Sequence, residues 1–458
     1  MALDYQKRIG EIVESQREIF IDVNDQIWGF AEPRFQEYKS AALHVKTMEN
    51  LGFTVRTNLA GEETAFIAEY GSGKPVIALL GEYDSLSGLS QEADNPERTA
   101  IIPGGDGHGC GHNLLGAGSA AACIGLKAEL EASGLSGTVV FYGCPAEEQT
   151  LGKGYMAKGG AFTECDVTFE WHPEMVNEVP LGTMNGVESA MIRFKGRTAH
   201  AAGNPQDGRS ALDAAQLFCL GVEFMREHVT DDVRMHYIYT DGGLAPNIVP
   251  DTAAVKIIVR AKSRDAVLDA FGRVLKCAEG ASIMTETQLE IERLGGLYPT
   301  LQNKVLAHHV HKVFSELPEV EYTEEELAFC DAINRHNPLY KEGATPPIRP
   351  EVLPLAPTDL FASTDYGDVM HIRPSLTINV VTSPTLCSGH SWMMTASVGS
   401  SVGMKGMLQA AKLIAIAAHG LCEDPSIVEA AKAEFDEVFK TRKPYESPIT
   451  DEVKCPFA

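Results

Sequence analysis

The sequence of 458 residues contains no apolar run that could cross a membrane. A transmembrane helix needs roughly 18 or more consecutive apolar residues, and no stretch of that length is present. The first eight residues, Met-Ala-Leu-Asp-Tyr-Gln-Lys-Arg, lack the apolar core of a signal peptide. The sequence therefore predicts a cytoplasmic protein without a membrane partner.

Closely spaced cysteines are also missing, because the ten cysteines are scattered along the chain. Several of them, such as Cys123, Cys144 and Cys219, lie in apolar periodic segments, where a reduced thiol packs as a small hydrophobic group. This pattern indicates a reducing compartment and argues against a disulfide framework.

Long basic clusters are absent, and residues 440–443 (Lys-Thr-Arg-Lys) form the longest one. The formal net charge is −25. Binding of nucleic acid needs basic patches that neutralise phosphates, so the sequence excludes nucleic acid as a partner. The same charge would attract a basic substrate, whereas a carboxylate substrate would have to be bound by a few local cations.

The length of the chain and its hydrophobic content of 44% predict two or more globular domains. Short apolar runs alternate with helical patterns, which is typical of an α/β fold. Residues 9–27 are predicted to form one amphipathic helix, and residues 395–419 a closing helix that packs on a sheet. Residues 86–106 and 342–358 are predicted to be long loops near a functional site.

The middle of the chain has a different order of predicted strands and helices. Its predicted elements are a strand at 190–197, a helix at 209–227, strands at 235–240 and 253–260, a helix at 264–278 and a strand at 287–293. The order β-α-β-β-α-β is that of a ferredoxin-like unit. The sequence thus predicts a domain at residues 184–295, inserted into an α/β domain formed by residues 1–183 and 296–458.

A glycine-rich loop at residues 107–113 (Gly-His-Gly-Cys-Gly-His-Asn) follows an apolar strand-like run and precedes a helix of small residues. Only one glycine separates Cys110 from His112, so both side chains can turn toward the same ion. Thiolate and imidazole are good ligands for a zinc-like ion. The alternative interpretation is a buried thiol next to an ordinary loop histidine.

Three later segments carry further candidate ligands, and each lies at the end of a short apolar run or follows one in the sequence. They hold the acid pair Glu147 and Glu148, then His172, and finally His390. Ligands of open parallel sheets gather at the carboxyl ends of the strands, so these segments are predicted to meet Cys110 there.

A dinuclear site needs about five or six protein ligands and an open position for water. Five are available, namely Cys110, His112, Glu148, His172 and His390. Glu147 is predicted to act as the general base, and Asp84 to hold a ligating imidazole in place. The alternatives are a solvated acid pair for Glu147 and Glu148 and a turn or cap aspartate for Asp84.

The motifs at residues 107–113, 145–148 (Pro-Ala-Glu-Glu), 171–174 (Trp-His-Pro-Glu) and 363–369 (Ser-Thr-Asp-Tyr-Gly-Asp-Val) resemble those of the aminoacylase/carboxypeptidase metallopeptidases. The likeness covers nearly the whole chain and is to the amidohydrolase branch, where a cysteine replaces an aspartate ligand. It implies a zinc-peptidase-like α/β/α catalytic domain, a lid that also makes the dimer, and a dinuclear Zn or Mn site. One departure is Glu82, at a position where many relatives carry the histidine of a His-x-Asp motif.

The resemblance also assigns roles to three residues of the inserted domain. His200 matches a histidine that reaches across the dimer to polarise the scissile carbonyl, and Asn247 and Arg260 match residues that receive the substrate carboxylate. An imidazole can stabilise an oxyanion, and a guanidinium binds a carboxylate with two hydrogen bonds. A surface or capping histidine and an edge-strand charge are the alternatives.

Together these features predict a metallo-amidohydrolase that uses two divalent ions, Zn or Mn, and a metal-activated water to cleave the amide of an N-acyl or N-aroyl amino acid. A homodimer is expected, with a homologous partner chain as a second possibility. The rival hypotheses are a dipeptidase for small dipeptides with a basic C-terminal residue and a non-catalytic partner of a homologous hydrolase.

Overall fold

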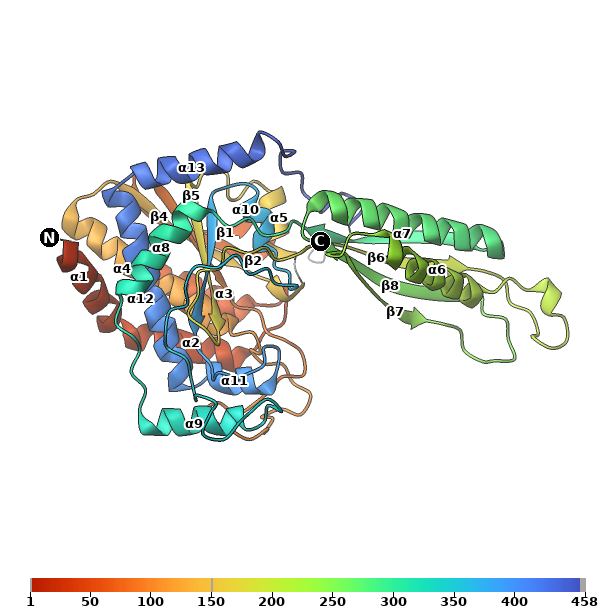
Figure 1. Ribbon diagram of the computed structural model, residues 1–458, viewed down its shortest axis with the longest axis horizontal. Coiled ribbons are helices and arrows are strands. Elements are labelled where there is room, and N and C mark those ends of the chain that lie inside the picture. Colours follow the sequence, from red (N-terminus) through yellow and green to blue (C-terminus); the bar gives the residue numbers. More distant parts are fainter. Residues whose placement is uncertain (1, 150, 454–458) are drawn as a thin grey trace.

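The computed structural model describes residues 2–149 and 151–453, which form an α/β body with an elongated unit projecting from it (Figure 1). The strands of the body, in their order across one sheet, are β1 (Thr54–Leu59), β2 (Glu62–Ser72), β4 (Gly137–Cys144), β3 (Val76–Glu82), β5 (Val167–Glu174) and β10 (Ser375–Val381). Its helices are α1 (Ala2–Ser15), α2 (Arg17–Phe30), α3 (Tyr38–Asn50), α4 (His112–Ser133), α5 (Gly152–Lys158), α8 (Lys304–Glu316), α9 (Glu324–Asn334), α10 (Tyr366–Met370), α11 (Trp392–Val398), α12 (Ser401–Glu423) and α13 (Ser426–Phe439).

Four of the six strands of this sheet are parallel. Strand β3 pairs in parallel with β4 and β5, and β5 pairs in parallel with β10. Strand β2 runs antiparallel to β4 and to β1. The carboxyl ends of β4, β3, β5 and β10 therefore lie along one edge, and the segments that follow them meet there.

Strand β3 shows how helices cover both faces of the sheet. Its side chains alternate, with Ile77 and Leu79 in a core shared with α1, α4 and α12, and Ala78 and Leu80 in a core shared with α5 and α10. All four residues are fully buried, which explains the unbroken apolar run of this strand. The result is the three-layer α/β/α architecture that the family resemblance implies.

The projecting unit, called the inserted unit below, comprises residues 186–297 and has its own sheet and core. Its elements are β6 (Gly186–Lys195), α6 (Ala211–Met225), β7 (Arg234–Asp241), β8 (Thr252–Ala261), α7 (Arg264–Thr285) and β9 (Gln288–Leu297). The predicted order β-α-β-β-α-β is present. The strands lie antiparallel in the order β7-β8-β6-β9, so β7 and β9 are the edges, and α6 and α7 pack side by side on the sheet.

Two of the predicted helices are interrupted in the structure. The single helix expected at residues 9–27 is two helices, α1 and α2, separated by Gln16 with φ −102° and ψ 4°. The closing helix expected at 395–419 is likewise split at Gly399, where a Cβ atom would lie 2.9 Å from the ring of Trp28. Periodicity missed both breaks because the apolar pattern continues across them. Helix α13 was not predicted.

Candidate metal centre

The candidate ligands meet at the carboxyl edge of the parallel strands. Cys110 lies in the loop between β3 and α4, and His112 is the first residue of α4. Glu148 lies in a short 3-10 turn, Glu147–Gln149, after β4, and His172 lies near the end of β5 and not after it. His390 precedes α11.

The donor atoms form two groups that share Cys110. One group is Cys110, His112 and His172, the other is Cys110, Glu148 and His390, and within each group the atoms lie within 4.8 Å of one another. Cys110 Sγ lies 3.4 Å from His172 Nε2, and His390 Nε2 lies 3.6 Å from Glu148 Oε2. Two triads with one thiol in common are the arrangement that two neighbouring ions with a bridging thiolate would need.

Asp84 connects the two groups through hydrogen bonds to a residue of each. Its Oδ1 accepts a hydrogen bond from His112 Nδ1 at 2.8 Å, and its Oδ2 accepts one from the Glu148 backbone N–H at 2.9 Å. The first bond leaves the lone pair of His112 Nε2 free for an ion. Asp84 is completely buried as a side chain, so both hydrogen bonds are shielded from water.

Several donor atoms of the site are buried and lack a hydrogen-bond partner within the described residues. They include His112 Nε2, Glu148 Oε1 and Glu82 Oε2. A buried polar atom without a partner is costly, and a bound cation would satisfy all three. The donor set of thiol, imidazoles and carboxylates therefore fits divalent metal ions.

Burial and mutual repulsion shape the protonation of these groups. Burial raises the pKa of Glu148 to about 7, and burial followed by the charges of Glu82, Asp365 and Glu148 raises the pKa of Glu147 well above its ordinary value. Burial lowers the pKa of His172 and of His390, which favours the neutral imidazoles that bind metals. Burial also lowers the pKa of His112, but Glu82, Cys110 and Asp84 outweigh this and raise it well above its ordinary value, so an ion would have to displace a proton there.

Glu147 sits on a tightly held turn. The preceding residue, Ala146, has a positive φ of 57°, which is unusual for a residue with a Cβ atom. Its backbone N–H donates to Glu37 Oε1 at 2.9 Å, and Glu37 is fully buried. Glu147 Oε2 lies 4.0 Å from His112 Nε2, beside the first donor group. The role of Glu37 was not predicted from the sequence, since it lies 109 residues from Ala146.

A second feature that was not predicted is a cluster of buried charges next to the donor groups, called the lysine cluster below. Lys153 of α5 is fully buried, and its ammonium contacts Glu82 directly. It also lies 2.6 Å from Asp365 Oδ1 and 3.2 Å from Glu170 Oε1. Burial lowers the pKa of Lys153, but the three carboxylates outweigh this and raise it well above its ordinary value.

A cavity of about 510 Å³ opens from the donor groups toward the base of the inserted unit. Arg260, near the end of β8, lines this cavity together with Cys110, Glu147 and His172. Arg260 Nη1 donates to Ser363 Oγ at 2.9 Å, and its Nε is buried without a hydrogen-bond partner among the described residues. The structure thus brings Arg260 to the predicted site, as one of the residues that line this cavity.

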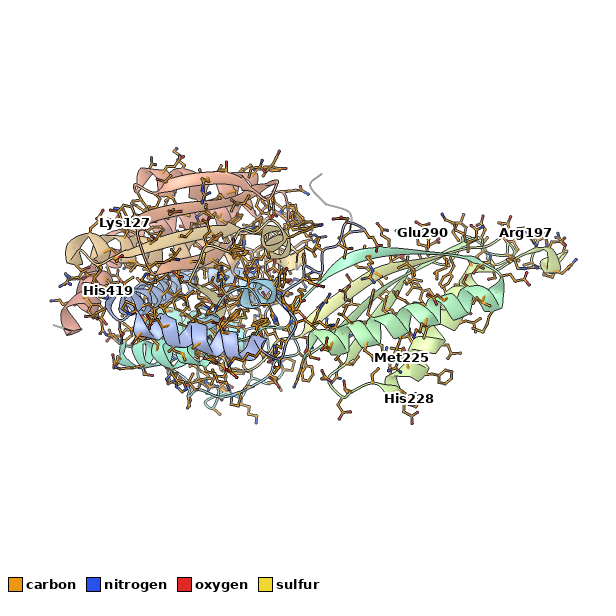
Figure 2. The ribbon with its side chains drawn as sticks, turned by 90° about the horizontal axis from the view of Figure 1, so that it is seen from above. Lys127, Arg197, Met225, His228, Glu290 and His419 are labelled. Carbon is orange, nitrogen blue, oxygen red and sulfur yellow. The ribbon has the colours of Figure 1, made fainter. Side chains whose placement is uncertain are left out.

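His200 and Asn247 lie elsewhere. Both are exposed, and their segments are adjacent, since the Ala201 N–H donates to the Asn247 carbonyl oxygen at 3.0 Å. Figure 2 labels Arg197, three residues before His200, at the end of the inserted unit that is remote from the body. Neither residue lines the cavity that contains Arg260. Within one chain, therefore, Asn247 and Arg260 are not brought together.

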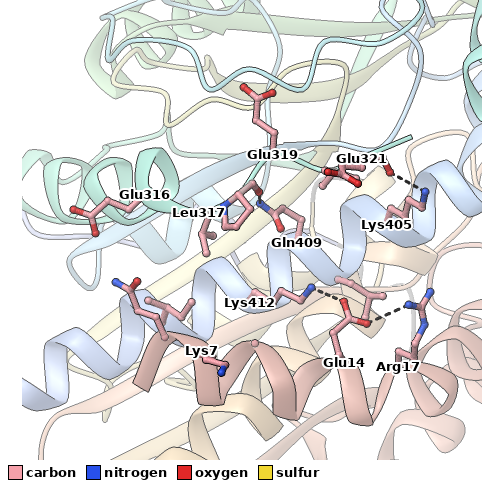
Figure 3. A pocket seen from close by; sticks show the side chains of 16 residues that line it. Lys7, Glu14, Arg17, Glu316, Leu317, Glu319, Glu321, Lys405, Gln409 and Lys412 are labelled. Atoms are coloured by element: carbon pink, nitrogen blue, oxygen red, sulfur yellow. Dashed lines mark hydrogen bonds and ion pairs between the residues drawn. The ribbon is translucent and has the colours of Figure 1, made fainter. Parts of the chain in front are cut away.

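A separate hollow of about 610 Å³ lies between α1, α12 and residues 316–321 (Figure 3). Some of its charges are paired: Lys412 donates to Glu14, and Arg17 Nη1 lies 3.1 Å from the same carboxylate. No cysteine or histidine is among the described residues that line it. This hollow therefore lacks, among its described residues, the thiol and imidazole donors of the candidate centre.

Comparison with known proteins gives a consistent picture. The model of peptidase family M20/M25/M40 matches residues 78–333. Over 97% of both chains, the sequence is 40% identical to one of the subunits of p-aminobenzoyl-glutamate hydrolase from Escherichia coli (strain K12). It is 26% identical to the Xaa-Arg dipeptidase of Mus musculus, over 94% of this chain and 91% of that one.

Solved structures agree on the fold. The Bacillus subtilis YXEP protein, a dinuclear metal-binding peptidase from the M20 family, matches with a TM-score of 0.59 at 18% identity. The match covers 90% of this chain and 99% of that chain. Among residues 2–149 and 151–453, no helix has both the length and the apolar composition needed to cross a membrane.

Proposed function

The chain belongs to peptidase family M20/M25/M40 and is a metal-dependent hydrolase of amide bonds, and we propose that it cleaves N-acyl or N-aroyl amino acids of the p-aminobenzoyl-glutamate type. The observation that carries the proposal is the cavity of about 510 Å³ that joins the donor groups to Arg260. One end of this space can hold the amide, and the other offers a guanidinium to the carboxylate of the released amino acid.

In this proposal Cys110, His112, Glu148, His172 and His390 hold two divalent ions, and Glu147 is the general base. When bound, the ions supply Lewis-acid chemistry and activate a water for attack on the amide carbon. Glu147 takes the proton of that water at a carboxylate oxygen and then passes it to the nitrogen of the leaving amine.

The metals are proposed to be zinc or manganese. A thiol and three imidazoles are donors that suit zinc, whereas carboxylates also suit manganese. Asp84 contributes by holding His112 and the Glu148 turn in fixed positions, as described above. Such supporting residues commonly change metal affinity by roughly 10- to 100-fold when they are replaced.

Recognition of the substrate carboxylate is assigned to Arg260. Burial lowers the pKa of Arg260, and the residue lines the cavity, so an incoming carboxylate would neutralise a partly buried charge. His200 and Asn247 are proposed to act in the site of a second protomer, because they lie away from the cavity of their own chain.

The surface of the inserted unit supports pairing with a second chain. Strand β7 is an edge strand, and its Ile238 and Tyr239 are 62% and 45% exposed. The adjacent helix α6 exposes Leu220 and Phe224 at 49% and 70%. An open strand edge beside exposed apolar side chains is a typical protein interface. We propose residues 184–295 as a lid and dimerisation domain, with a second copy or a homologous chain as partner.

Two alternatives have some support. The relative named as an Xaa-Arg dipeptidase, the net charge of −25 and the presence of Glu170 and Glu174 in the cavity favour a dipeptide with a basic C-terminal residue. A non-catalytic partner of a homologous hydrolase is the other alternative. The two donor groups and the base Glu147 speak against it, since a binding module needs neither.

The decisive experiment is elemental analysis followed by a hydrolysis screen of the purified full chain. The screen compares p-aminobenzoyl-glutamate, N-acetyl amino acids and dipeptides that end in arginine or lysine, each with and without a chelator. We expect two ions per chain and chelator-sensitive cleavage of the acylated amino acids. Cleavage of the basic dipeptides alone would establish the first alternative. Two bound ions with activity only after addition of a homologous chain would establish the second.

A further inference from the structure

The lysine cluster contains one cation and three carboxylates among the described residues. Glu82, Glu170 and Asp365 surround the ammonium of Lys153, and all four residues are fully or almost fully buried. Buried charges are expensive to desolvate, and an uneven cluster is more expensive still. Burial raises the pKa of Glu170 well above its ordinary value, which favours its neutral form. Glu82 and Asp365 then still set two carboxylates against one ammonium, so a further positive charge beside them would be stabilising.

Glu82 faces two ways. Its Oε1 contacts the ammonium of Lys153, whereas its Oε2 has no hydrogen-bond partner among the described residues and lies 3.1 Å from His112 Nε2. The side chains of Glu82 and His112 are 2% and 0% exposed, so the space between them is shielded from bulk water. The unpartnered oxygen of Glu82 therefore lies beside the nitrogen that would bind an ion.

The contact of Glu82 with His112 pairs two acceptors. Asp84 Oδ1 already takes the hydrogen on His112 Nδ1 at 2.8 Å, which leaves a lone pair on Nε2 in the neutral ring. Two lone pairs at 3.1 Å repel unless positive charge lies beside both. Without an ion a proton on His112 supplies this charge, because Glu82, Cys110 and Asp84 outweigh burial and raise the pKa of His112 well above its ordinary value. A bound ion would take the place of that proton. Glu82, His112 and Glu147 form a third set of donor atoms, all within 4.8 Å of one another.

We infer that Glu82 is a sixth metal-binding group, directed at the ion on His112, and that Lys153 and Asp365 position it there. The inference rests on the metal centre proposed above and adds a ligand at the place where the sequence departs from the His-x-Asp pattern. One Glu82 oxygen binds Lys153, and that contact turns the other toward His112. A carboxylate thus replaces the imidazole that many relatives carry.

Asp365 is well placed to fix Lys153. Its Oδ2 accepts a hydrogen bond from the Lys153 backbone N–H at 2.8 Å, and its Oδ1 binds the ammonium of the same residue at 2.6 Å. Both ends of the lysine are thereby tied to one carboxylate on the loop before α10. The cluster links that loop, the start of α5 and the end of β3 directly behind the metal centre.

The first test is Glu82→Gln, which keeps the shape of the side chain and removes its charge. We expect the weaker-bound ion to be lost or its dissociation constant to rise at least about tenfold, measured by elemental analysis and by competition with a chelator. The control is Glu129→Gln, which changes a buried carboxylate paired with Arg8. Two ions in wild type and unchanged affinity in Glu82→Gln would overturn the inference. No ions in wild type would instead contradict the proposed metal centre itself.

The second test separates positioning from general stability. For Lys153→Met and Asp365→Asn, the melting temperature is measured without metal and with saturating zinc. A ligand stabilises only the state that binds it, so a positioning role predicts a smaller zinc-induced rise in melting temperature than in wild type. The exposed lysine of the same helix supplies the control, Lys158→Met.

An equal fall of both melting temperatures, with an unchanged zinc-induced rise, would mean that the cluster is only structural. Asp365→Asn leaves Lys153 in contact with the carboxylates of Glu82 and Glu170. It therefore provides the measurement if Lys153→Met does not fold.

Discussion

The metal centre and the outer end of the inserted unit are built in opposite ways. At the centre, segments at the ends of parallel strands bring donor groups together within one chain, and the buried carboxylates of Asp84 and Glu37 hold them. At the outer end, His200 and Asn247 lie on exposed segments, and the ring of His200 accepts hydrogen bonds from nearby backbone N–H groups. One region is assembled within a single chain, whereas the other presents its side chains to solvent.

Because of this difference, metal binding and turnover should depend on different parts of the molecule. Preorganised ligands bind an ion without help from another molecule, but an exposed histidine contributes to catalysis only when a substrate is placed against it. We therefore expect metal binding to depend on the body alone and turnover to depend on a second inserted unit. Each variant below tests one side of this comparison.

Cys110→Ser should have the largest effect, because Cys110 belongs to both donor groups. A hydroxyl is a much poorer ligand than a thiolate, so both ions should be lost and activity should fall below detection. Elemental analysis measures the loss, and the control is Cys123→Ala, a buried cysteine of α4 outside the donor groups. Full occupancy in Cys110→Ser would remove this residue from the centre.

Glu147→Gln should keep both ions and lose activity by roughly 10²- to 10⁴-fold, the usual size of general acid-base catalysis. The amide can still hydrogen-bond the attacking water, but it cannot take its proton. Metal content and kcat are measured on the same preparation. A variant with full metal and nearly normal kcat would show that another group is the base.

His200→Ala should reduce kcat by roughly 10²- to 10³-fold, as the removal of an oxyanion donor does, without changing metal content. The stronger test mixes His200→Ala chains with Glu147→Gln chains. If His200 acts in the partner's site, each mixed dimer regains one intact site, and random mixing should restore about a quarter of wild-type activity. Mixed dimers that form but remain inactive would place His200 in its own protomer's site or outside catalysis.

The sequence predicted the parts of the site that follow local rules. Cys110 with His112, the pair Glu147 and Glu148, and His390 each lie after the end of a strand, and parallel strands bring such ends together. The order of elements in the inserted unit was predicted for a similar reason, since alternating apolar positions mark its strands and helices.

The features that were not predicted depend on contacts between distant segments. Lys153 follows a glycine at the start of a short helix and looks like a surface lysine, because lysine is rarely buried without a partner and its partners are far away in the sequence. Likewise, no sequence signal distinguishes Glu37 from other glutamates, because its role depends on the contact with the Ala146 N–H. Gly399, at the break between α11 and α12, has no room for a Cβ atom beside the ring of Trp28, and no local pattern contains this contact.

Arg260→Ala should have the smallest effect on kcat and the sharpest effect on substrate choice. Arg260 belongs to the inserted unit but lines the cavity of its own chain. It therefore connects the inserted unit with the metal centre of the body. A hydrogen bond between charged groups contributes about 1.5–3 kcal/mol, which corresponds to a rise in KM of roughly 10- to 150-fold for substrates with a free carboxylate. The corresponding amide substrates should be much less affected. Lys262→Ala, which removes a nearby cation paired with Asp359, is the matched control. Equal losses on acid and amide substrates would make Arg260 a structural residue, and the binding of the carboxylate would then have to come from the outer end of the partner's inserted unit.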